Sequence, residues 1–310
     1  MCILWQACII GLYISFIMIG LGEVGMDSRL VGVECEVNKE RKKNDMVKLA
    51  LLILVVVLIS DILFEIKVTK LVYGVYETSK LPMGKKLKVL QISDFHDKKS
   101  YHDELLIKIQ GLSPDIVVIT GDFLDADTKD LKNAYSFIDK LKKINSNIYF
   151  VSGNHEWRNS NREKFIQGLK DRKVYVLNNG NNVVTINNIK INLCGIDDFN
   201  TKHGNLQQAL EEIDRSNLTL LLSHVPNIAM RNKDLDVDLV LSGHTHGGQV
   251  RLPFIGALIA PGQGYFPKYT KGFYKINKNI VYIDSGAGTS SFPVRFLNRS
   301  QVSLITFEGR

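Results

Sequence analysis

The sequence predicts an α/β protein with a largely parallel sheet, preceded by an N-terminal membrane segment. Short apolar runs of strand length alternate with amphipathic stretches of helical period over most of the 310 residues. Several of these runs end in polar residues, as strands of open α/β sheets do at ligand sites. Long apolar segments lie outside this alternation, within the first 64 residues.

Two apolar segments in the N-terminal region are candidates for crossing a membrane. Residues 3–22 carry no charge and approach the ~20 residues that span a bilayer. Residues 49–64 form a second run with Asp61 near its end. We interpret this run as a membrane segment or signal anchor rather than a buried helix, because it lies outside the α/β pattern. We therefore predict an anchoring region over residues 1–64 and a main domain over residues 65–310.

A basic stretch, Lys39–Lys43, separates the two apolar runs. The positive-inside rule places such a stretch in the cytoplasm, so we expect a cell-membrane protein whose main domain is extracytoplasmic. Met46 directly precedes the second run and would also suit the start of a signal anchor. The sequence leaves a start at Met1 or at Met46 open, and either start keeps an anchor.

Composition narrows the classes of partner. The formal net charge is +7, and the surplus of cations lies beyond residue 64. Such a surplus suits an anionic substrate or an anionic membrane surface. Basic and aromatic residues do not interleave, so nucleic acid is not expected as a partner. The four cysteines include no Cys-x-x-Cys pair, and Cys194 lies in an apolar run that favours burial.

The main domain is expected to begin with a polar stalk and entry loop over residues 65–86. The first half then predicts strands at 87–92, 115–120 and 147–152, and helices at 102–112, 129–144 and 162–173. The second half predicts a hairpin at 183–195 with its turn at Asn187-Asn188, a helix at 206–213 and strands at 218–222 and 237–241. Strands at 280–283 and 302–307 are expected on an edge or in a second sheet. Residues 249–274 show neither period and predict a loop.

Five predicted strands each end in polar, metal-ligating residue types. These residues are Asp94 and His96, Asp122, Asn154 and His155, His224, and His244 and His246. The set includes five of the seven histidines. A buried core histidine is the simpler interpretation of any one of them, but five coincidences at strand ends favour one shared site.

The chemistry of these side chains indicates a metal centre without thiolate ligands. Carboxylate and amide oxygens together with imidazoles suit Mn²⁺, which we place first, or Fe or Zn²⁺. The donors are too many for one ion. Two divalent ions about 3.5–4 Å apart, bridged by one carboxylate, would use them all.

The ordered motifs resemble those of the calcineurin-like metallophosphoesterase superfamily. They are Asp94-x-His96, Gly121-Asp122, Gly153–Glu156, His224 and Gly243-His244-x-His246, and the resemblance covers residues 85–310. It implies a four-layer α/β/β/α sandwich of two mixed sheets. It further implies that Asp94, His96 and His246 bind one ion, that Asn154, His224 and His244 bind the other, and that Asp122 bridges them. His155 would be the catalytic acid or a phosphate-stabilising group.

The resemblance implies hydrolysis of a phosphodiester or pyrophosphate bond by a metal-bridging hydroxide. The anchor and residues 249–274 resemble membrane-associated bacterial enzymes related to UDP-2,3-diacylglucosamine hydrolases, which implies a phosphorylated small-molecule or lipid-linked substrate. The absence of Arg soon after Asp122 disfavours a phosphoprotein phosphatase. A nucleotide phosphodiesterase or nuclease of the same fold, and a non-catalytic module that retains the fold, are the alternatives. We expect a monomer.

Several nearby residues have simpler roles. Glu156 is expected to orient His155 or cap a helix rather than bind metal. Asp125 and Asp127 are interpreted as turn residues, and solvated loop charge is the simplest interpretation of Lys98, Lys99 and Arg158. For Asp197-Asp198 and for residues 285–291, turn chemistry and a place near the site are left open.

Overall fold

The computed structural model describes residues 32–98, 102–289 and 292–310. The expected membrane segment at residues 3–22 lies outside these ranges. The chain divides into two compact units, residues 1–57 and residues 58–310, and we call the second the main unit.

One long helix, α2 (Gly32–Lys67), joins the expected second apolar run to the basic stretch before it. Its part from Glu40 to Lys67 is long and apolar enough to cross a membrane, and little of it is buried by protein. The helix is therefore consistent with a membrane segment. The expectation of a basic loop at Lys39–Lys43 is wrong, because these residues continue the helix.

Two six-stranded mixed sheets form the centre of the main unit. The first has the order β1-β16-β2-β3-β4-β5, and the second has the order β14-β15-β9-β8-β7-β6. In the first sheet the bounds are β1 Lys70–Thr78, β2 Lys86–Ile92, β3 Ile116–Thr120, β4 Ile148–Val151, β5 Tyr175–Val176 and β16 Gln301–Gly309. In the second sheet they are β6 Gly180–Ile186, β7 Ile189–Gly195, β8 Leu218–Leu222, β9 Leu239–Ser242, β14 Gly272–Ile276 and β15 Asn279–Ile283.

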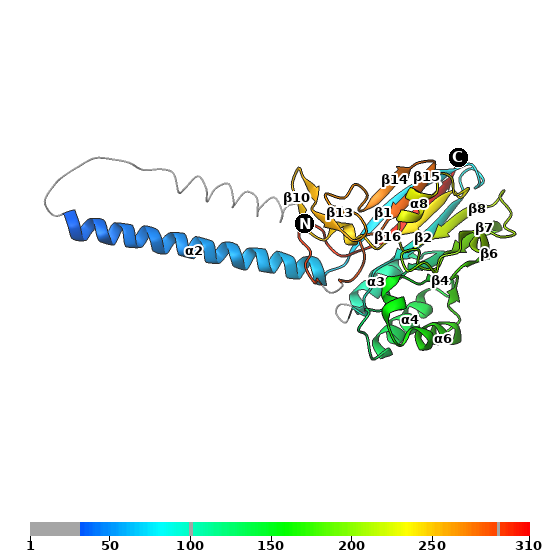
Figure 1. Cartoon of the computed structure of the whole chain (residues 1–310), viewed down its shortest axis with the longest axis horizontal. Helices are drawn as coiled ribbons and strands as arrows, with labels where there is room; N and C mark the ends of the chain where they lie inside the picture. Colours follow the sequence, from blue (N-terminus) through cyan, green and yellow to red (C-terminus); the bar gives the residue numbers. More distant parts are fainter. Residues whose placement is uncertain (1–31, 99–101, 290–291) are drawn as a thin grey trace. The chain divides into compact units, whose positions relative to one another are not determined.

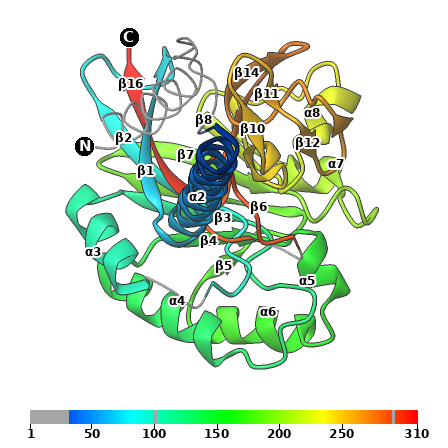
Figure 2. The same ribbon diagram turned by 90° about the vertical axis from the view of Figure 1, so that its left-hand side faces the viewer.

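Helices cover the outer faces of both sheets. Figure 2 shows α3 (His102–Leu112), α4 (Lys132–Ile144) and α6 (Arg162–Asp171) side by side along the outside of the first sheet. The short helices α7 (Leu206–Ala209) and α8 (Asn227–Arg231) lie on the side of the second sheet, and α5 (Asn154–Arg158) follows β4. The predicted α/β/β/α sandwich of two mixed sheets is confirmed.

The alternation of side chains along each strand builds the layers. In β2, Leu87 and Val89 belong to the core between the two sheets, whereas Leu90 and Ile92 pack against α3 and α4. A third apolar cluster covers the outer face of the second sheet. The strands β3, β4, β8 and β9 are buried on both faces, which explains why they read as continuous apolar runs.

Two expectations about the sheets are wrong. Residues 65–86 include β1, which pairs in parallel with β16 over nine residue pairs and so is not a stalk. β16 lies inside the first sheet, because β1 pairs outside it, and so is neither on an edge nor in the second sheet. β15 lies in the second sheet, as expected. The paired residues of β1 and β16 are more than 200 positions apart in the chain, so no local sequence pattern predicts that these strands pair.

The expected loop at residues 249–274 is also more ordered than its sequence suggests. It contains the hairpin of β10 (Arg251–Leu252) with β11 (Gly256–Ala257) and the hairpin of β12 (Ile259–Ala260) with β13 (Gly264–Tyr265). The 3₁₀ turn η1 (His246–Gly248) precedes them. Strands of two residues are too short to show a period in the sequence. The hairpin turn at Asn187-Asn188 is as expected, with φ of 50° and 66°.

Candidate metal centre

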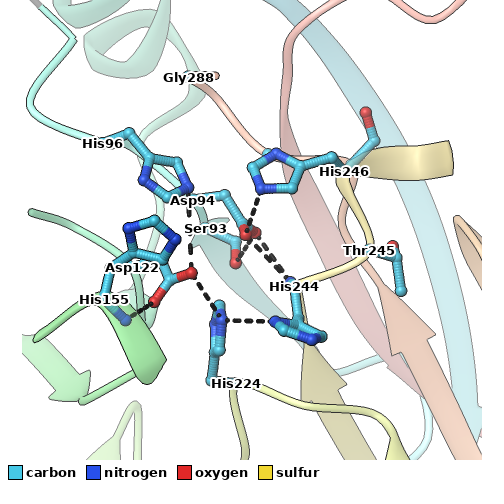
Figure 3. Close-up of polar contacts among 12 residues, drawn as sticks. Ser93, Asp94, His96, Asp122, His155, His224, His244, Thr245, His246 and Gly288 are labelled. Carbon is cyan, nitrogen blue, oxygen red and sulfur yellow. Dashed lines mark hydrogen bonds and ion pairs between the residues drawn. The ribbon is translucent and has the colours of Figure 1, made fainter. Parts of the chain in front are cut away.

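Six of the seven predicted ligands come together at the carboxyl ends of strands from both sheets (Figure 3). The seventh, Asn154, lines the same cavity as Asp122 and His244. Asp94 and His96 follow β2, Asp122 follows β3, and Asn154 begins α5 directly after β4. His224 follows β8, and His244 and His246 follow β9. All seven are buried. The two sheets thus contribute opposite walls of one site.

One group of donors consists of Asp94, His96 and His246. One ligand atom from each lies within 4.8 Å of the others. Nε2 of His246 is 3.5 Å from Oδ1 of Asp94, and the rings of His96 and His246 are stacked with centroids 5.1 Å apart. Ser93 fixes the Asp94 carboxylate, since its hydroxyl donates to Oδ2 at 2.6 Å.

A second group consists of Asp122, His224 and His244, again within 4.8 Å of one another. Nε2 of His224 is 3.0 Å from Oδ2 of Asp122 and 3.2 Å from Nδ1 of His244. Thr120 orients the His224 ring, because its carbonyl oxygen is 2.9 Å from Nδ1. A ring nitrogen held by a backbone carbonyl in this way leaves the other nitrogen free to bind metal.

Asp122 connects the two groups. Its Oδ2 atom is 3.9 Å from Nε2 of His96 and also faces His224. Its Oδ1 atom accepts a 2.8 Å hydrogen bond from the backbone N–H of His155. The carboxylate therefore lies centrally, where both groups can share it.

The donor atoms fit divalent ions. Among the described residues, both ring nitrogens of His96, Nδ1 of His246 and Oδ1 of Asn154 are buried without a hydrogen-bond partner. Buried polar atoms almost always have a hydrogen-bond partner. Several potential metal-ligand atoms without such a partner in one site therefore indicate that the site binds an ion. Imidazole nitrogens and hard oxygens without thiolates are the ligands of a divalent metal centre.

The electrostatics follow from burial and close contact. Burial lowers the pKa of His96 to about 4 and that of His244 to about 3. Burial also raises the pKa of Asp94 to about 6. Burial alone would raise the pKa of Asp122, but the adjacent His224 and the other imidazoles outweigh it and lower that pKa. Burial alone would lower the pKa of His224, but the contact with Asp122 outweighs it and raises the pKa to about 10, so a bound cation would have to displace the His224 proton. The neutral forms of His96 and His244 and the ionised form of Asp122 are the forms that bind cations.

His155 lies beside the two groups, and Asp125 positions it. Nδ1 of His155 is 2.7 Å from Oδ1 of Asp125, and the backbone N–H of Ala126 donates to the same oxygen at 2.8 Å. Burial would lower the pKa of His155, but the hydrogen bond to Asp125 outweighs it and raises the pKa. Sequence reasoning treated Asp125 as a turn residue and missed this contact. The spacing of 30 residues between the partners gives no sequence signal.

Glu156 does not face the donor groups. Its carboxylate accepts hydrogen bonds from the backbone N–H groups of Asp122, Leu124 and Gly153 at 2.7–2.9 Å. The bond from Gly153 caps the start of α5, as expected. The other two hold the loop that carries Asp122, so Glu156 supports the site through the backbone.

The backbone around the site is strained. Five of the seven predicted ligands have left-handed φ angles between 48° and 68°, namely Asp94, His96, Asp122, His244 and His246. This region costs roughly 1–2 kcal/mol for a residue with a side chain. Such strain gathers at functional sites, where the surrounding structure enforces it.

A cavity of about 390 Å³ opens onto the donors. Among its lining residues are Asp122, Asn154, His155, His244 and His246. The cavity is also lined by Arg158, Asn200, Thr201, Pro261 and Gly262. Asp197 and Asp198 serve local structure, because Asp197 accepts from the Trp157 indole at 2.7 Å and Asp198 accepts from the Thr201 N–H at 2.7 Å.

Lys98 differs from its expected role as a solvated loop charge. Its ammonium donates to the carbonyl oxygens of Ile66 and Ala287 and to the hydroxyl of Thr69, at 2.8–3.0 Å. Burial lowers its pKa to about 7. Lys98 thereby joins the last turn of α2 to the loop that passes Asp94.

Arg295 and Asn298 were missed by sequence reasoning. Arg295 is fully buried and donates to backbone carbonyls of residues 285–288. Asn298 donates to the carbonyl oxygen of His246 at 2.6 Å. Both support loops that carry the site, but their local sequence resembles any polar surface loop.

Substitution Gly243→Ala is expected to disrupt the site. A Cβ atom at this position would lie 1.8 Å from Oγ of Ser93 and 2.3 Å from Oδ2 of Asp94. We expect bound metal to fall below half of the wild-type stoichiometry and activity to fall by about a hundredfold. Elemental analysis of the purified full chain and steady-state kinetics measure both.

Gly111→Ala is the matched control, because a Cβ atom there would meet nothing within 4 Å. Wild-type metal content and activity in Gly243→Ala would contradict the assigned close approach.

Comparison with known proteins agrees with this geometry. The family described as calcineurin-like phosphoesterase matches residues 87–248, which is more than half of the chain. The metallophosphoesterase YkuE of Bacillus subtilis is 28% identical over 72% of this chain and 79% of its own length. The metallophosphoesterase Cj0846 of Campylobacter jejuni is 33% identical over 74% of this chain and 61% of its own.

A third relative, from Bos taurus, is named a transmembrane protein with metallophosphoesterase domain. It is 28% identical over 74% of this chain, and the match spans 54% of its own length. The match thus covers only part of some relatives. The family match spans β2 to η1, which includes the buried cluster of histidines and aspartates, and the relatives are named metallophosphoesterases. The chain therefore belongs to the calcineurin-like phosphoesterase family and is a metal-dependent phosphoester hydrolase.

Proposed function

We propose that the protein is a membrane-anchored dinuclear phosphoesterase that hydrolyses a phosphodiester or pyrophosphate bond of a lipid-linked substrate. The observation that carries this proposal is the arrangement of two donor groups around one shared carboxylate, Asp122. In the proposed assignment, Asp94, His96 and His246 hold one ion, and Asn154, His224 and His244 hold the other. Mn²⁺ is the proposed metal, with Fe or Zn²⁺ as alternatives.

The bound ions would lower the pKa of water and neutralise the charge of the phosphoryl group. The protein's own residues orient the reactants. His155 lines the cavity and its Nδ1 is hydrogen-bonded to Asp125, so Nε2 is the ring nitrogen proposed to hold a proton for the leaving oxygen. The raised pKa of His155 supports this assignment as the catalytic acid.

The cavity supports a substrate with two phosphates. Arg158 is exposed at its rim, and no side chain in the described part of the chain pairs with its guanidinium. Asn200 and Thr201 add an amide and a hydroxyl beside it. The guanidinium of Arg158 lines the same cavity as the metal-binding residues. It therefore suits the second phosphate of a pyrophosphate whose first phosphate lies at the metal centre.

The membrane part of the proposal rests on α2 and on the transmembrane relative. We propose the related UDP-2,3-diacylglucosamine type of substrate, with the main unit on the outer side of the cell membrane. A nucleotide-linked lipid combines a pyrophosphate with acyl chains at the membrane surface.

The full chain in detergent, assayed with Mn²⁺, tests the proposal. We expect turnover of bis-p-nitrophenyl phosphate and faster turnover of UDP-2,3-diacylglucosamine, both abolished by a chelator and restored by Mn²⁺. Preference for a soluble nucleotide phosphodiester over the lipid would instead support the alternative function. Turnover of none of these with any divalent metal would refute the dinuclear proposal.

Arg158→Ala separates a pyrophosphate from a simple diester. We expect the KM for the nucleotide-linked lipid to rise by about 10–100-fold, because a charged hydrogen bond is lost. Turnover of bis-p-nitrophenyl phosphate is expected to stay within about twofold. Arg231→Ala, another exposed arginine at the end of a short helix, serves as the control. Equal effects on both substrates would argue against a second phosphate site.

A further inference from the structure

We propose that the two hairpins β10–β11 and β12–β13 form a membrane-contact surface that inserts into the interfacial region of a phospholipid bilayer. Within residues 254–266 the structure exposes large apolar side chains at Phe254, Ile255, Ile259, Tyr265 and Phe266. Phe254 is fully exposed, and Tyr265 and Phe266 are 79% and 70% exposed. Five exposed large apolar side chains within thirteen residues suit an interaction surface, whereas single exposed residues do not.

The exposure is a built feature of the hairpins. Arg251 pairs with Ala257 and Ala260 pairs with Gly264, so both hairpins have fixed register. The guanidinium of Arg251 donates to the Gly247 carbonyl at 2.9 Å, which anchors the first hairpin to η1. The first hairpin is thus held at its base, and Phe254 and Ile255 are exposed at its turn. In the second hairpin the exposed apolar side chains lie in the strands and directly after them, at Ile259, Tyr265 and Phe266.

The bond network joins the hairpins to the end of the apolar helix. β10 is bridged to Phe296 through Val250, and the following residues reach the last turn of α2. The backbone N–H of Ser300 donates to the Glu65 carbonyl at 2.9 Å, and the N–H of Asn298 donates to the Glu65 carboxylate. All of these residues belong to the main unit. If α2 crosses a membrane, Glu65 marks the membrane surface, and the hairpins begin only a few residues from it.

Charge also favours a lipid surface over a protein partner. Lys67 and Lys268 are exposed beside the helix end and the second hairpin, respectively. Arg299 lies over the Phe64 ring at 5.1 Å. Aromatic side chains flanked by cations are typical of segments at the interface of anionic bilayers. Figure 1 shows β10 and β13 at one end of the main unit, with β6 and β7 at the other.

The β12–β13 hairpin also forms a wall of the metal-centre cavity. Pro261 and Gly262, in the turn between β12 and β13, line the cavity, and a Cβ atom on Gly262 would be 3.5 Å from Nε2 of His244. Insertion of Tyr265 and Phe266 would therefore bring the cavity to the lipid surface. The membrane contact stands on the exposed hairpins, and only its role in substrate delivery rests on the proposed function.

Lipid contact can be measured in the full chain without an enzymatic assay. Cys2, Cys8 and Cys35 are replaced by serine, and buried Cys194 is kept. Single variants Phe254→Cys, Phe266→Cys and Val183→Cys carry an environment-sensitive fluorophore. Val183 is 50% exposed in β6 and serves as the matched control. The proteins are reconstituted into vesicles of phosphatidylcholine and phosphatidylglycerol.

We expect a blue-shifted emission at positions 254 and 266, and quenching by lipids that carry a nitroxide on the acyl chain. Position 183 should show neither effect. Equal, unquenched emission at all three positions would overturn the proposal. Energy transfer between copies labelled at position 254, without quenching by lipid, would show that the hairpins contact a second copy of the chain and would contradict the membrane contact.

A triple variant tests the role in substrate delivery. Phe254→Ser, Tyr265→Ser and Phe266→Ser together should raise the KM for UDP-2,3-diacylglucosamine in vesicles by about tenfold. Turnover of soluble bis-p-nitrophenyl phosphate should stay within about twofold, which shows that the variant folds. If the KM of the triple variant is unchanged although the labelled single variants are quenched by lipid, the hairpins attach the protein to the bilayer without a role in substrate delivery. Failure of every hydrolysis assay would count against the proposed function and leave the quenching result to decide the membrane contact.

Discussion

Replacing Asp122 with alanine is expected to abolish metal-dependent hydrolysis and to empty the metal centre. The Asp122 carboxylate lies between two groups of donors and is 3.0 Å from Nε2 of His224. Its removal takes a ligand from both proposed ions and leaves mutually repelling cations without the negative charge between them. We expect kcat for bis-p-nitrophenyl phosphate to fall by about 10³-fold or more, and bound metal to fall to less than one ion per chain.

The control is Asp127→Ala, which removes an exposed carboxylate five residues away in the same loop. It should keep wild-type metal content and activity. Asp122→Asn preserves the shape of the side chain and separates the loss of charge from the loss of volume. An Asp122→Ala protein that retains two ions and full turnover would rule out the bridging assignment.

Arg295→Ala is expected to produce the largest loss of stability in the main unit. Arg295 is fully buried, and its guanidinium donates to the carbonyl oxygens of Ser285, Gly286 and Gly288 at 2.7–3.3 Å. The variant would leave several buried carbonyl groups without a donor and open a cavity in their midst. We expect the free energy of unfolding to fall by about 3–5 kcal/mol, equivalent to roughly 10 °C or more in Tm.

Thermal unfolding of the full chain in detergent, followed by fluorescence, measures this change. Arg295→Lys should recover only part of the stability, because an ammonium group cannot reproduce the planar set of donors. Arg231→Ala, at an exposed position, should shift Tm by no more than about 2 °C. An Arg295→Ala protein with the wild-type Tm would show that water replaces the guanidinium without cost.

The sequence predicted the site more fully than it predicted the sheets. Each proposed ligand directly follows a strand that is buried on both faces, such as β3 before Asp122. Such strands appear as apolar runs with sharp ends, so the residues after them stand out. In an α/β sheet these ends converge, and local sequence is then sufficient to place residues such as Asp94 and His224 together.

The remaining structure depends on partners that are distant in the chain. β1 alternates between exposed and half-buried residues and becomes a strand because β16 pairs with it. The local sequence of Lys98 is that of a solvated loop charge. Only the fold places the carbonyl oxygens of Ile66 and Ala287 within hydrogen-bond distance of its ammonium. Arg295 likewise has no local partner pattern. These features come from tertiary contacts, which a single sequence does not reveal.

The hydrogen bonds at Glu65 and Ile66 bear on where the enzyme can be separated from its anchor. The last turn of α2 contacts Asn298, Ser300 and Lys98 and so belongs to the folded enzyme, although it ends an apolar helix. A protease that cuts after Lys67 would remove these contacts together with the anchor, whereas a cut before Leu58 would spare them. If α2 crosses a membrane as proposed, the release of an enzyme that keeps these contacts would require cleavage inside the apolar helix itself, where the bilayer would shield the chain.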